Sequence, residues 1–191
     1  MLLFLTKALA AIIGLVLAPP CVVLGYMADY LDRYSEVSLL VSRIPFYIGE
    51  YTRLFYYKCT LSHVGKSVCF KYGSFCQYRT TSLGNRVLIG YYGALGQVHI
   101  GDDVLVGGFV NFISGTRQHS FAPGDLDRDD QRAHGRRTIH VGSGVWIGSN
   151  CLIAADIGDR SVIGAGSVLV RPADSNSVYA GNPAKCIRKL S

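Results

Sequence analysis

The sequence predicts a mainly β fold, a triangular solenoid of stacked coils, preceded by an N-terminal α-helical, membrane-associated region. Two observations predict it. An aliphatic residue followed by glycine recurs at a six-residue period from about Val64 onward, and the 21 residues from Ala8 to Ala28 carry no charge. A fixed short period is typical of coils that stack on one another, and about 20 apolar residues can cross a bilayer as a helix.

The composition limits the number of domains and the kinds of partner that the chain can have. At 191 residues the chain has room for one domain and an appendage, and its 17% of charged residues is low for a soluble domain. The net charge of +6, with Arg132, Arg136 and Arg137 among the basic residues, suits phosphates or an anionic membrane surface. The sequence has no basic stripe interleaved with aromatic residues, so nucleic-acid binding is the weaker interpretation. The six dispersed cysteines are typical of small buried side chains in a reducing compartment.

The uncharged N-terminal stretch has Pro19 and Pro20 near its middle. Proline removes a backbone donor and disfavours helical geometry in the residue before it. The stretch is therefore either a kinked span or two short helices that form a re-entrant hairpin, and we favour the hairpin. A cleaved signal peptide is disfavoured, because no small-x-small cleavage site follows the apolar run.

Residues 30–58 mix aromatic and basic side chains, which favours an amphipathic helix at the level of the lipid headgroups. The alternative is a helix that packs on the end of the solenoid. We expect a membrane-associated region over residues 1–60, with lipid contacts through residues 8–57. The solenoid follows over residues 61–178, and a C-terminal cap over residues 179–191.

The repeats predict three short strands per coil, with the aliphatic side chain in a narrow core. Two breaks in register are visible, one residue lost between Leu95 and Ile100 and two between Ile153 and Ile157. Small side chains four places after the aliphatic residue fit the corners: Val87, Val104, Val145, Ser161 and Ser167. The open ends of the solenoid need covers, for which the N-terminal helices and residues 180–191 are the candidates.

Three segments resemble the hexapeptide-repeat acetyltransferases, in particular the sugar and polysaccharide O-acetyltransferase branch. They are Val141-Gly-Ser-Gly-Val-Trp-Ile-Gly148, the run from Ile157 to Val168, and Ala180-Gly-Asn-Pro-Ala-Lys185. The resemblance covers roughly residues 64–191 and implies a left-handed parallel β-helix. The segment 40–57 is similar to the lead-in of the polysaccharide branch, which favours a glycan or lipid-linked sugar as acceptor.

Acetyl transfer to a hydroxyl needs a base, and neutral histidine has a suitable pKa. The resemblance implies that His119, in the interruption of the repeats at residues 114–138, is that base, with His134 as second candidate. The resemblance to the soluble sugar enzymes implies that Asn111 contacts the acceptor or the developing oxyanion, and the alternative is an asparagine that bonds its own backbone at a corner. The carboxylate that orients His119 stays open among Asp102, Asp103, Asp125, Asp127, Asp129 and Asp130. For His63, His99 and His140 we favour a structural role.

The donor implied by the resemblance is acetyl-CoA, bound in a groove between two subunits of a homotrimer. The matching positions are Trp146, Gly148, Ser149, Ala165, Gly166 and Ser167, with Arg171, Lys185 and Arg188 near the CoA phosphates. Trp146 has solenoid packing as its alternative role. No metal is expected, and a γ-type carbonic anhydrase is disfavoured because the histidine spacing does not fit its zinc site.

The sequence therefore predicts an acetyl-CoA-dependent O-acetyltransferase that acts on a sugar of a bacterial surface glycan or its lipid-linked precursor. Because acetyl-CoA is a cytosolic metabolite, we expect the protein at the cytoplasmic face of the inner membrane. An amino-sugar N-acetyltransferase is the enzymatic alternative, although no N-terminal nucleotide-binding domain is visible. The non-enzymatic alternative is a membrane-bound β-helix scaffold.

Overall fold

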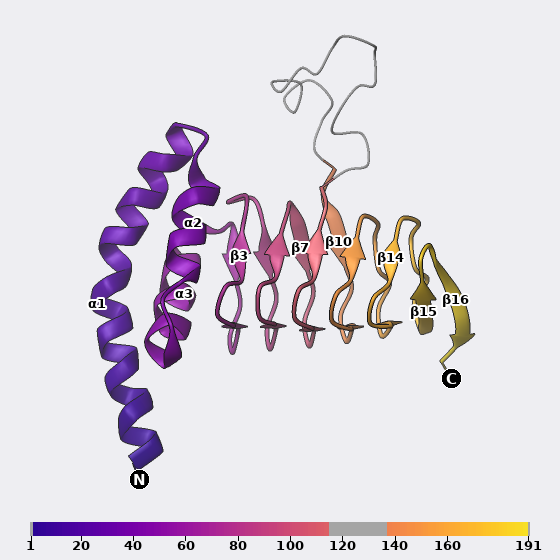
Figure 1. The fold of residues 1–191 in the computed structure, drawn as a ribbon, viewed down its shortest axis with the longest axis horizontal. Helices are drawn as coiled ribbons and strands as arrows, with labels where there is room; N and C mark the ends of the chain where they lie inside the picture. The colour runs from indigo at the N-terminus through magenta and orange to yellow at the C-terminus, as the bar shows by residue number, and fades with distance from the viewer. Residues whose placement is uncertain (1, 115–136, 191) are drawn as a thin grey trace.

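The computed structural model describes residues 2–114 and 137–190, and consists of a helical layer followed by a row of β coils (Figure 1). The helices are α1 (Leu2–Tyr30), α2 (Tyr34–Ser42) and α3 (Phe46–Thr60). They stand at one end of the row, and a C-terminal β-hairpin stands at the other (Figure 1). The predicted solenoid fold is confirmed, as is the long N-terminal helical segment.

α1 is one continuous helix with Pro19 and Pro20 inside it, so the predicted re-entrant hairpin is wrong. Both prolines lie on an exposed side of the helix. The opposite side packs on α3, with buried small residues at Ala10, Gly14 and Ala18. Long-range packing therefore holds the helix straight through two positions that cannot donate backbone hydrogen bonds.

Residues 34–60 form two helices that pack on the first coil, as in the alternative that we disfavoured. The ring of Tyr57 lies 4.4 Å from that of Phe70, centroid to centroid, and both residues are fully buried. Arg53 is also fully buried and donates to the carbonyl oxygens of Phe70, Ser42 and Ile44 at 3.0, 3.1 and 2.8 Å. Its guanidinium thus joins the helices to the solenoid.

Three parallel sheets form the faces of the solenoid. The first sheet contains β1 (His63–Val64), β4 (Ser82–Leu83), β7 (Val98–Ile100) and β10 (Ile139–Val141). The second contains β2 (Cys69–Phe70), β5 (Leu88–Ile89), β8 (Leu105–Val106), β11 (Trp146–Ile147), β13 (Val162–Ile163), β15 (Ser177–Gly181) and β16 (Ala184–Lys189). The third contains β3 (Phe75–Cys76), β6 (Ala94–Leu95), β9 (Asn111–Phe112), β12 (Leu152–Ile153) and β14 (Val168–Leu169).

The repeating aliphatic residues fill the core as predicted. Leu83, Ile89 and Leu95, one from each face of the second coil, are fully buried. Burial of a side chain of this size contributes roughly 1.5–3 kcal/mol. The small residues predicted at the corners are buried too: Val87, Val104, Val145, Ser161 and Ser167. The antiparallel pair β15 and β16 covers the last coil, and α2 and α3 cover the first.

The corners between the sheets differ in regularity. At the first corner (first to second sheet) and the second corner (second to third sheet), the third residue after the inward aliphatic position has a left-handed backbone, as in Arg86 (φ 55°) and Tyr92 (φ 56°). Among the described residues, no such position recurs at the third corner (third to first sheet). Both breaks in register fall at this third corner, where the chain needs no fixed turn.

A hydrogen-bonded ladder runs along the first corner. The backbone N–H of Asn85 donates to Asp102 Oδ1 at 2.6 Å, and its side-chain amide donates to the same oxygen at 3.1 Å. The backbone N–H of Asp102 donates to Ser143 Oγ at 3.1 Å, and that of Ser143 to Asp159 Oδ1 at 2.7 Å. These bonds tie successive coils together at the turn.

Candidate active site

The predicted base His119 and its alternative His134 lie outside the described residues, in the long link between β9 and β10 at the third corner. Gln97 of the neighbouring coil holds both described ends of this link. Its backbone N–H donates to Ser114 Oγ, and its side chain donates to Thr138 Oγ1 at 2.7 Å. The link therefore leaves the solenoid and returns to it at one place.

Asn111 lies in β9 on the outward face of the third sheet, between Ala94 and Leu152. Its side chain is exposed. With Gln77 and Ser114 it lines a shallow depression of about 260 Å³. The structure thus places Asn111 beside the point at which the link that contains His119 begins.

Four of the predicted CoA-binding residues meet at the second corner of the last two complete coils, a region that we call the small-residue shelf: Gly148, Ser149, Ala165 and Gly166. The N–H of Gly166 donates to the carbonyl of Ser149 at 2.9 Å. A Cβ on Gly148 would lie 2.5 Å from the backbone nitrogen of Ala165, whereas a Cβ on Gly166 would meet nothing within 4 Å. The shelf is therefore closely packed beneath and open above, which lets a ligand approach the main chain.

Ser167 has a different role from the other residues of this group. Its side chain is fully buried. The hydroxyl donates to the carbonyl of Gly164 at 2.5 Å and accepts from the N–H of Gly181 at 3.2 Å. The bond from Gly181 holds the C-terminal hairpin on the last coil and the bond to Gly164 is local to that coil, so the hydroxyl is occupied within the protein.

Lys185 pairs with Ala180 in the hairpin, and Ala180 packs on Gly164, next to the shelf. The sequence analysis missed Gly181 at this place, where φ is +103°. The Ala180-Gly181 pair within the C-terminal motif could have indicated this position. A glycine at a turn predicts a backbone with positive φ, which other residues rarely adopt.

Trp146 stands on the outward face of the second sheet, between Leu105 and Val162. Its side chain is 55% exposed, so it does not fill the solenoid core. Arg188 pairs with Val178, which continues the same outward row. Trp146 and Arg188 therefore share one face of the molecule, and Asn111 lies on another.

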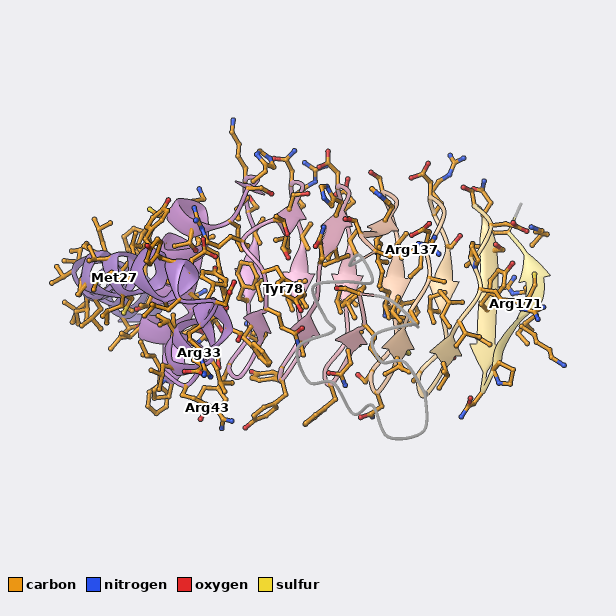
Figure 2. The ribbon with its side chains drawn as sticks, turned by 90° about the horizontal axis from the view of Figure 1, so that it is seen from above. Met27, Arg33, Arg43, Tyr78, Arg137 and Arg171 are labelled. Atoms are coloured by element: carbon orange, nitrogen blue, oxygen red, sulfur yellow. The ribbon has the colours of Figure 1, made fainter. Side chains whose placement is uncertain are left out.

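Arg171 follows β14 and belongs to the third corner, whereas Gly166 precedes β14 at the second corner. The whole strand separates them. In Figure 2 Arg171 is labelled near the C-terminal hairpin, at the end of the row of coils opposite the helices. Within one chain the structure does not bring Arg171 to the shelf.

The remaining described histidines form an outward row on the first sheet, where His63 aligns with Ser82, Ser82 with His99, and His99 with His140. The rings of His99 and His140 lie 5.3 Å apart, and Ser82 Oγ is 3.0 Å from His99 Nδ1. Partial burial, and then repulsion from His140, lowers the pKa of His99.

His99 and His140 line a depression of about 600 Å³ on the first sheet. Asp156 also lines it, and its carboxylate accepts from Arg137 at 2.5 Å and from the backbone N–H of His140 at 2.9 Å. Within residues 2–114 and 137–190, no group of three or more histidine, cysteine or acidic residues has the arrangement of a metal site.

The second corner carries an aromatic column in the first coils, which the sequence analysis also missed. The ring of Tyr92 lies 5.1 Å from that of Phe109, in a stacked arrangement, and 5.7 Å from that of Tyr72, edge to face. Tyr92 and Phe109 are 41% and 53% exposed. The signal was their recurrence three places after an inward aliphatic residue. Along the second corner, the surface is therefore aromatic in the first coils and formed by the small-residue shelf in the last coils.

A polar depression of about 540 Å³ lies where the helices meet the first coil. Hydroxyl and amide side chains of Ser62, Thr80 and Gln97 line it, together with the Arg79 and Asp29 pair, whose closest atoms are 2.7 Å apart. Gln77 lines both this depression and the smaller one at Asn111. Hydroxyl and amide groups of this kind can form hydrogen bonds with a sugar.

Comparison with known proteins identifies the repeats of the solenoid. The family model described as "Hexapeptide repeat of succinyl-transferase" matches residues 138–171, which contain Trp146 and the shelf. A putative acetyltransferase of Saccharomyces cerevisiae, YJL218W, is 42% identical over 71 residues, which cover 36% of this chain and 36% of that protein. The chain thus spans about a third of the length of this curated relative.

Two solved structures share the fold. A maltose O-acetyltransferase from Clostridium difficile 630 superposes with a TM-score of 0.71 at 22% identity, covering 86% of this chain and 89% of the other. A galactoside acetyltransferase in complex with coenzyme A superposes with a TM-score of 0.71 at 24% identity, covering 86% and 83%. The molecule is thus a left-handed parallel β-helix built from hexapeptide repeats. The architecture shows the fold, and the local sequence matches support a relationship to the hexapeptide-repeat acetyltransferases.

Proposed function

We propose that the protein is an O-acetyltransferase that moves an acetyl group from acetyl-CoA to a hydroxyl of a sugar in a bacterial surface glycan or its lipid-linked precursor. The observation that carries the proposal is the small-residue shelf at the second corner, which is open above Gly166. It lies within the segment that matches the family. Related structures support the donor, since one of them was solved in complex with coenzyme A.

The proposed chemistry is a single acyl transfer. The acceptor hydroxyl attacks the thioester carbonyl carbon while its proton passes to the imidazole of His119; the carbon–sulfur bond then breaks and the leaving thiolate takes up that proton. The amide of Asn111 donates a hydrogen bond to the developing oxyanion or orients the acceptor. The exposed position of Asn111, beside the start of the link that contains His119, supports this assignment.

The complete site is proposed to form between two copies of the chain in a homotrimer. Trp146 lies on the second sheet and Asn111 on the third, so the two side chains cannot line one pocket of a single solenoid. A groove in which the second sheet of one copy faces the third sheet of another would bring them together. Arg171, which is remote from the shelf within one chain, would then meet the CoA phosphates bound by the neighbouring copy.

The acceptor and location are proposed from the helical layer. α1 is long and apolar enough to cross or enter a membrane by length and composition. The polar depression at the junction opens between this layer and the Asn111 depression, where a membrane-bound sugar could reach the third corner. Because the donor is cytosolic, the cytoplasmic face of the inner membrane is the proposed location.

The test is the release of CoA thiol from acetyl-CoA by detergent-purified protein with a panel of acceptors. The panel contains free sugars, the matching amino sugars, and lipid-linked sugars. We expect release that depends on a hydroxyl acceptor and is greatest with a lipid-linked sugar. Preference for the amine of an otherwise identical sugar would replace O-acetyl by N-acetyl transfer. Absence of CoA binding would contradict acyl transfer altogether and leave the scaffold alternative.

A further inference from the structure

The outer surface of α1 is apolar along its whole described length. On the side opposite α3, Leu5, Ile12, Val16, Val23 and Met27 are each 55% to 69% exposed. The most apolar window of the helix has a mean hydropathy of 2.4, with 22% of it buried. Exposed apolar surfaces of this extent mark contact with a membrane or a partner. In Figure 2 Met27 is labelled in the helical layer, away from the coils.

α1 is fixed along α3, and the two helices run in the same direction. Lys7 lies over the ring of Tyr47, 5.2 Å from its centroid, near the start of both helices. Tyr26 donates to the carbonyl of Cys59 at 2.7 Å near their ends. Between these points the helices touch, since a Cβ on Gly14 would lie 2.8 Å from the Cβ of Tyr51. α1 therefore cannot be turned independently of α3.

α3 is in turn fixed to the first coil. The buried Arg53 donates to the carbonyl of Phe70, and the backbone N–H of Cys76 donates to the hydroxyl of Tyr57 at 3.2 Å. Glu50 forms an ion pair with Lys71 of the first coil at 2.8 Å. α1 thus lies across the end of the solenoid, at the same level as the first coil (Figure 1).

This attachment decides how α1 can meet a lipid bilayer. If α1 crossed the bilayer, α3 and the first coil would enter the hydrocarbon region with it, and so would the turns of that coil and the exposed Lys66. Irregular backbone and charged groups are not stable against lipid tails. We infer that α1 lies flat within one leaflet, without crossing it, so that the solenoid projects from the membrane surface; this inference rests on the membrane association proposed above.

Charge supports a lipid surface as the occupant of this face. Exposed basic residues stand at both ends of α3, Arg43 before its start and Lys58 in its last turn. Figure 2 labels Arg43 in the helical layer near Arg33, whose guanidinium is paired with Glu36 at 2.7 Å and is not counted among these cations. A flat α1, about 43 Å long, would place its apolar side among the acyl chains and these cations near anionic headgroups. The alternative occupant is the α1 face of a second copy of the chain.

The experiment measures the depth of α1 in vesicles of phosphatidylcholine and phosphatidylglycerol. The chain has one tryptophan, so a Trp146→Phe background allows a single tryptophan to be introduced by Leu5→Trp, Val16→Trp or Met27→Trp. Lipids brominated near the headgroup or near the chain end then report the depth of each by fluorescence quenching. We expect equal quenching profiles at the three positions, and none for an Ile187→Trp control, which is exposed on the C-terminal hairpin.

A deep position 16 between shallow positions 5 and 27 would overturn the flat placement and leave membrane association standing. Failure of the protein to float with vesicles, with α1-dependent dimers in solution, would overturn both. In the same assay, Val16→Glu is expected to weaken vesicle binding at least tenfold. Val170→Glu, at a solenoid position that is 44% exposed, is expected to leave it unchanged; equal losses would contradict the assignment of this face.

Discussion

The first and second corners of the solenoid are built alike in every described coil, whereas the third corner differs from coil to coil. At the first two corners a residue with left-handed backbone, such as Asp103 or Phe109, closes a turn of fixed length. At the third corner the step between inward residues is seven residues from Cys76 to Leu83 and four from Ile153 to Ile157. Fixed corners keep the coils in register, and a free corner can accept an insertion.

The strongest way to test this difference is to remove the insertion. Deletion of residues 115–136 joins Ser114 to Arg137 and leaves a seven-residue step from Phe112 to Val141, as in the first coil. We expect the thermal midpoint and CoA binding to stay close to those of the wild type. Transfer should fall at least about a hundredfold, because His119 is lost. An unfolded variant would show that the third corner is not free to vary.

A smaller effect is expected at the second corner. A Cβ added by Gly148→Ala would meet the backbone of Ala165 at 2.5 Å, and one added by Gly90→Ala would meet the backbone of Gly107 at 2.5 Å. Both substitutions overfill the corner and should lower the free energy of unfolding by about 1–3 kcal/mol. Only Gly148→Ala should also weaken CoA binding, by at least tenfold, as measured by calorimetry. Equal CoA affinities would remove the shelf from the donor site.

The smallest effect concerns the ladder of the first corner. The backbone N–H of Asn85, and then its side-chain amide, lowers the pKa of Asp102 from its ordinary 3.8. Because the pKa of this carboxyl group is lower in the folded than in the unfolded protein, the carboxylate stabilises the fold at pH values above the unfolded-state pKa. This contribution is lost as the pH falls through the folded-state pKa. Asp102→Ala should lower the thermal midpoint by a few degrees at pH 7, and less below pH 3.8. Asp102→Asn keeps an acceptor oxygen and should recover most of the loss; a midpoint as low as that of the alanine variant would contradict the ladder.

The sequence was sufficient for the solenoid because its repeat acts locally and in every coil. Each aliphatic residue before glycine predicts its own burial, as Ile89 and Ile147 show. The helical layer depends on contacts between distant segments, so local sequence patterns gave wrong predictions for it. Pro19 and Pro20 predicted a break, yet packing along α3 keeps one helix. The aromatic residues Tyr56 and Tyr57 suggested lipid headgroups, but both are buried, Tyr57 against Phe70 of the first coil and Tyr56 against Tyr34 of α2.

The candidate site was predictable in part for the same reason. Gly148, Ala165 and Gly166 all lie within three places after an inward isoleucine of successive coils, Ile147 or Ile163, so their spacing brings them together. Ser167 fits the same spacing, but its hydroxyl is bonded to Gly164 of its own coil and to Gly181 of the hairpin, and the second bond is one that no local pattern shows. Arg171 lies on another corner, because a short run of sequence turns around the solenoid within a few residues. The face that a residue occupies therefore depends on how many residues each preceding corner contains.

The most direct test of the account is the rate of acceptor-dependent CoA release by His119→Ala, measured beside the wild type and His63→Ala. His63 is an exposed histidine of β1, so its substitution controls for the loss of an imidazole elsewhere on the surface. The account predicts that His119→Ala loses about a hundredfold or more of the rate with unchanged CoA binding, while His63→Ala keeps the wild-type rate. Full activity of His119→Ala would contradict the assignment of the catalytic base to the third corner.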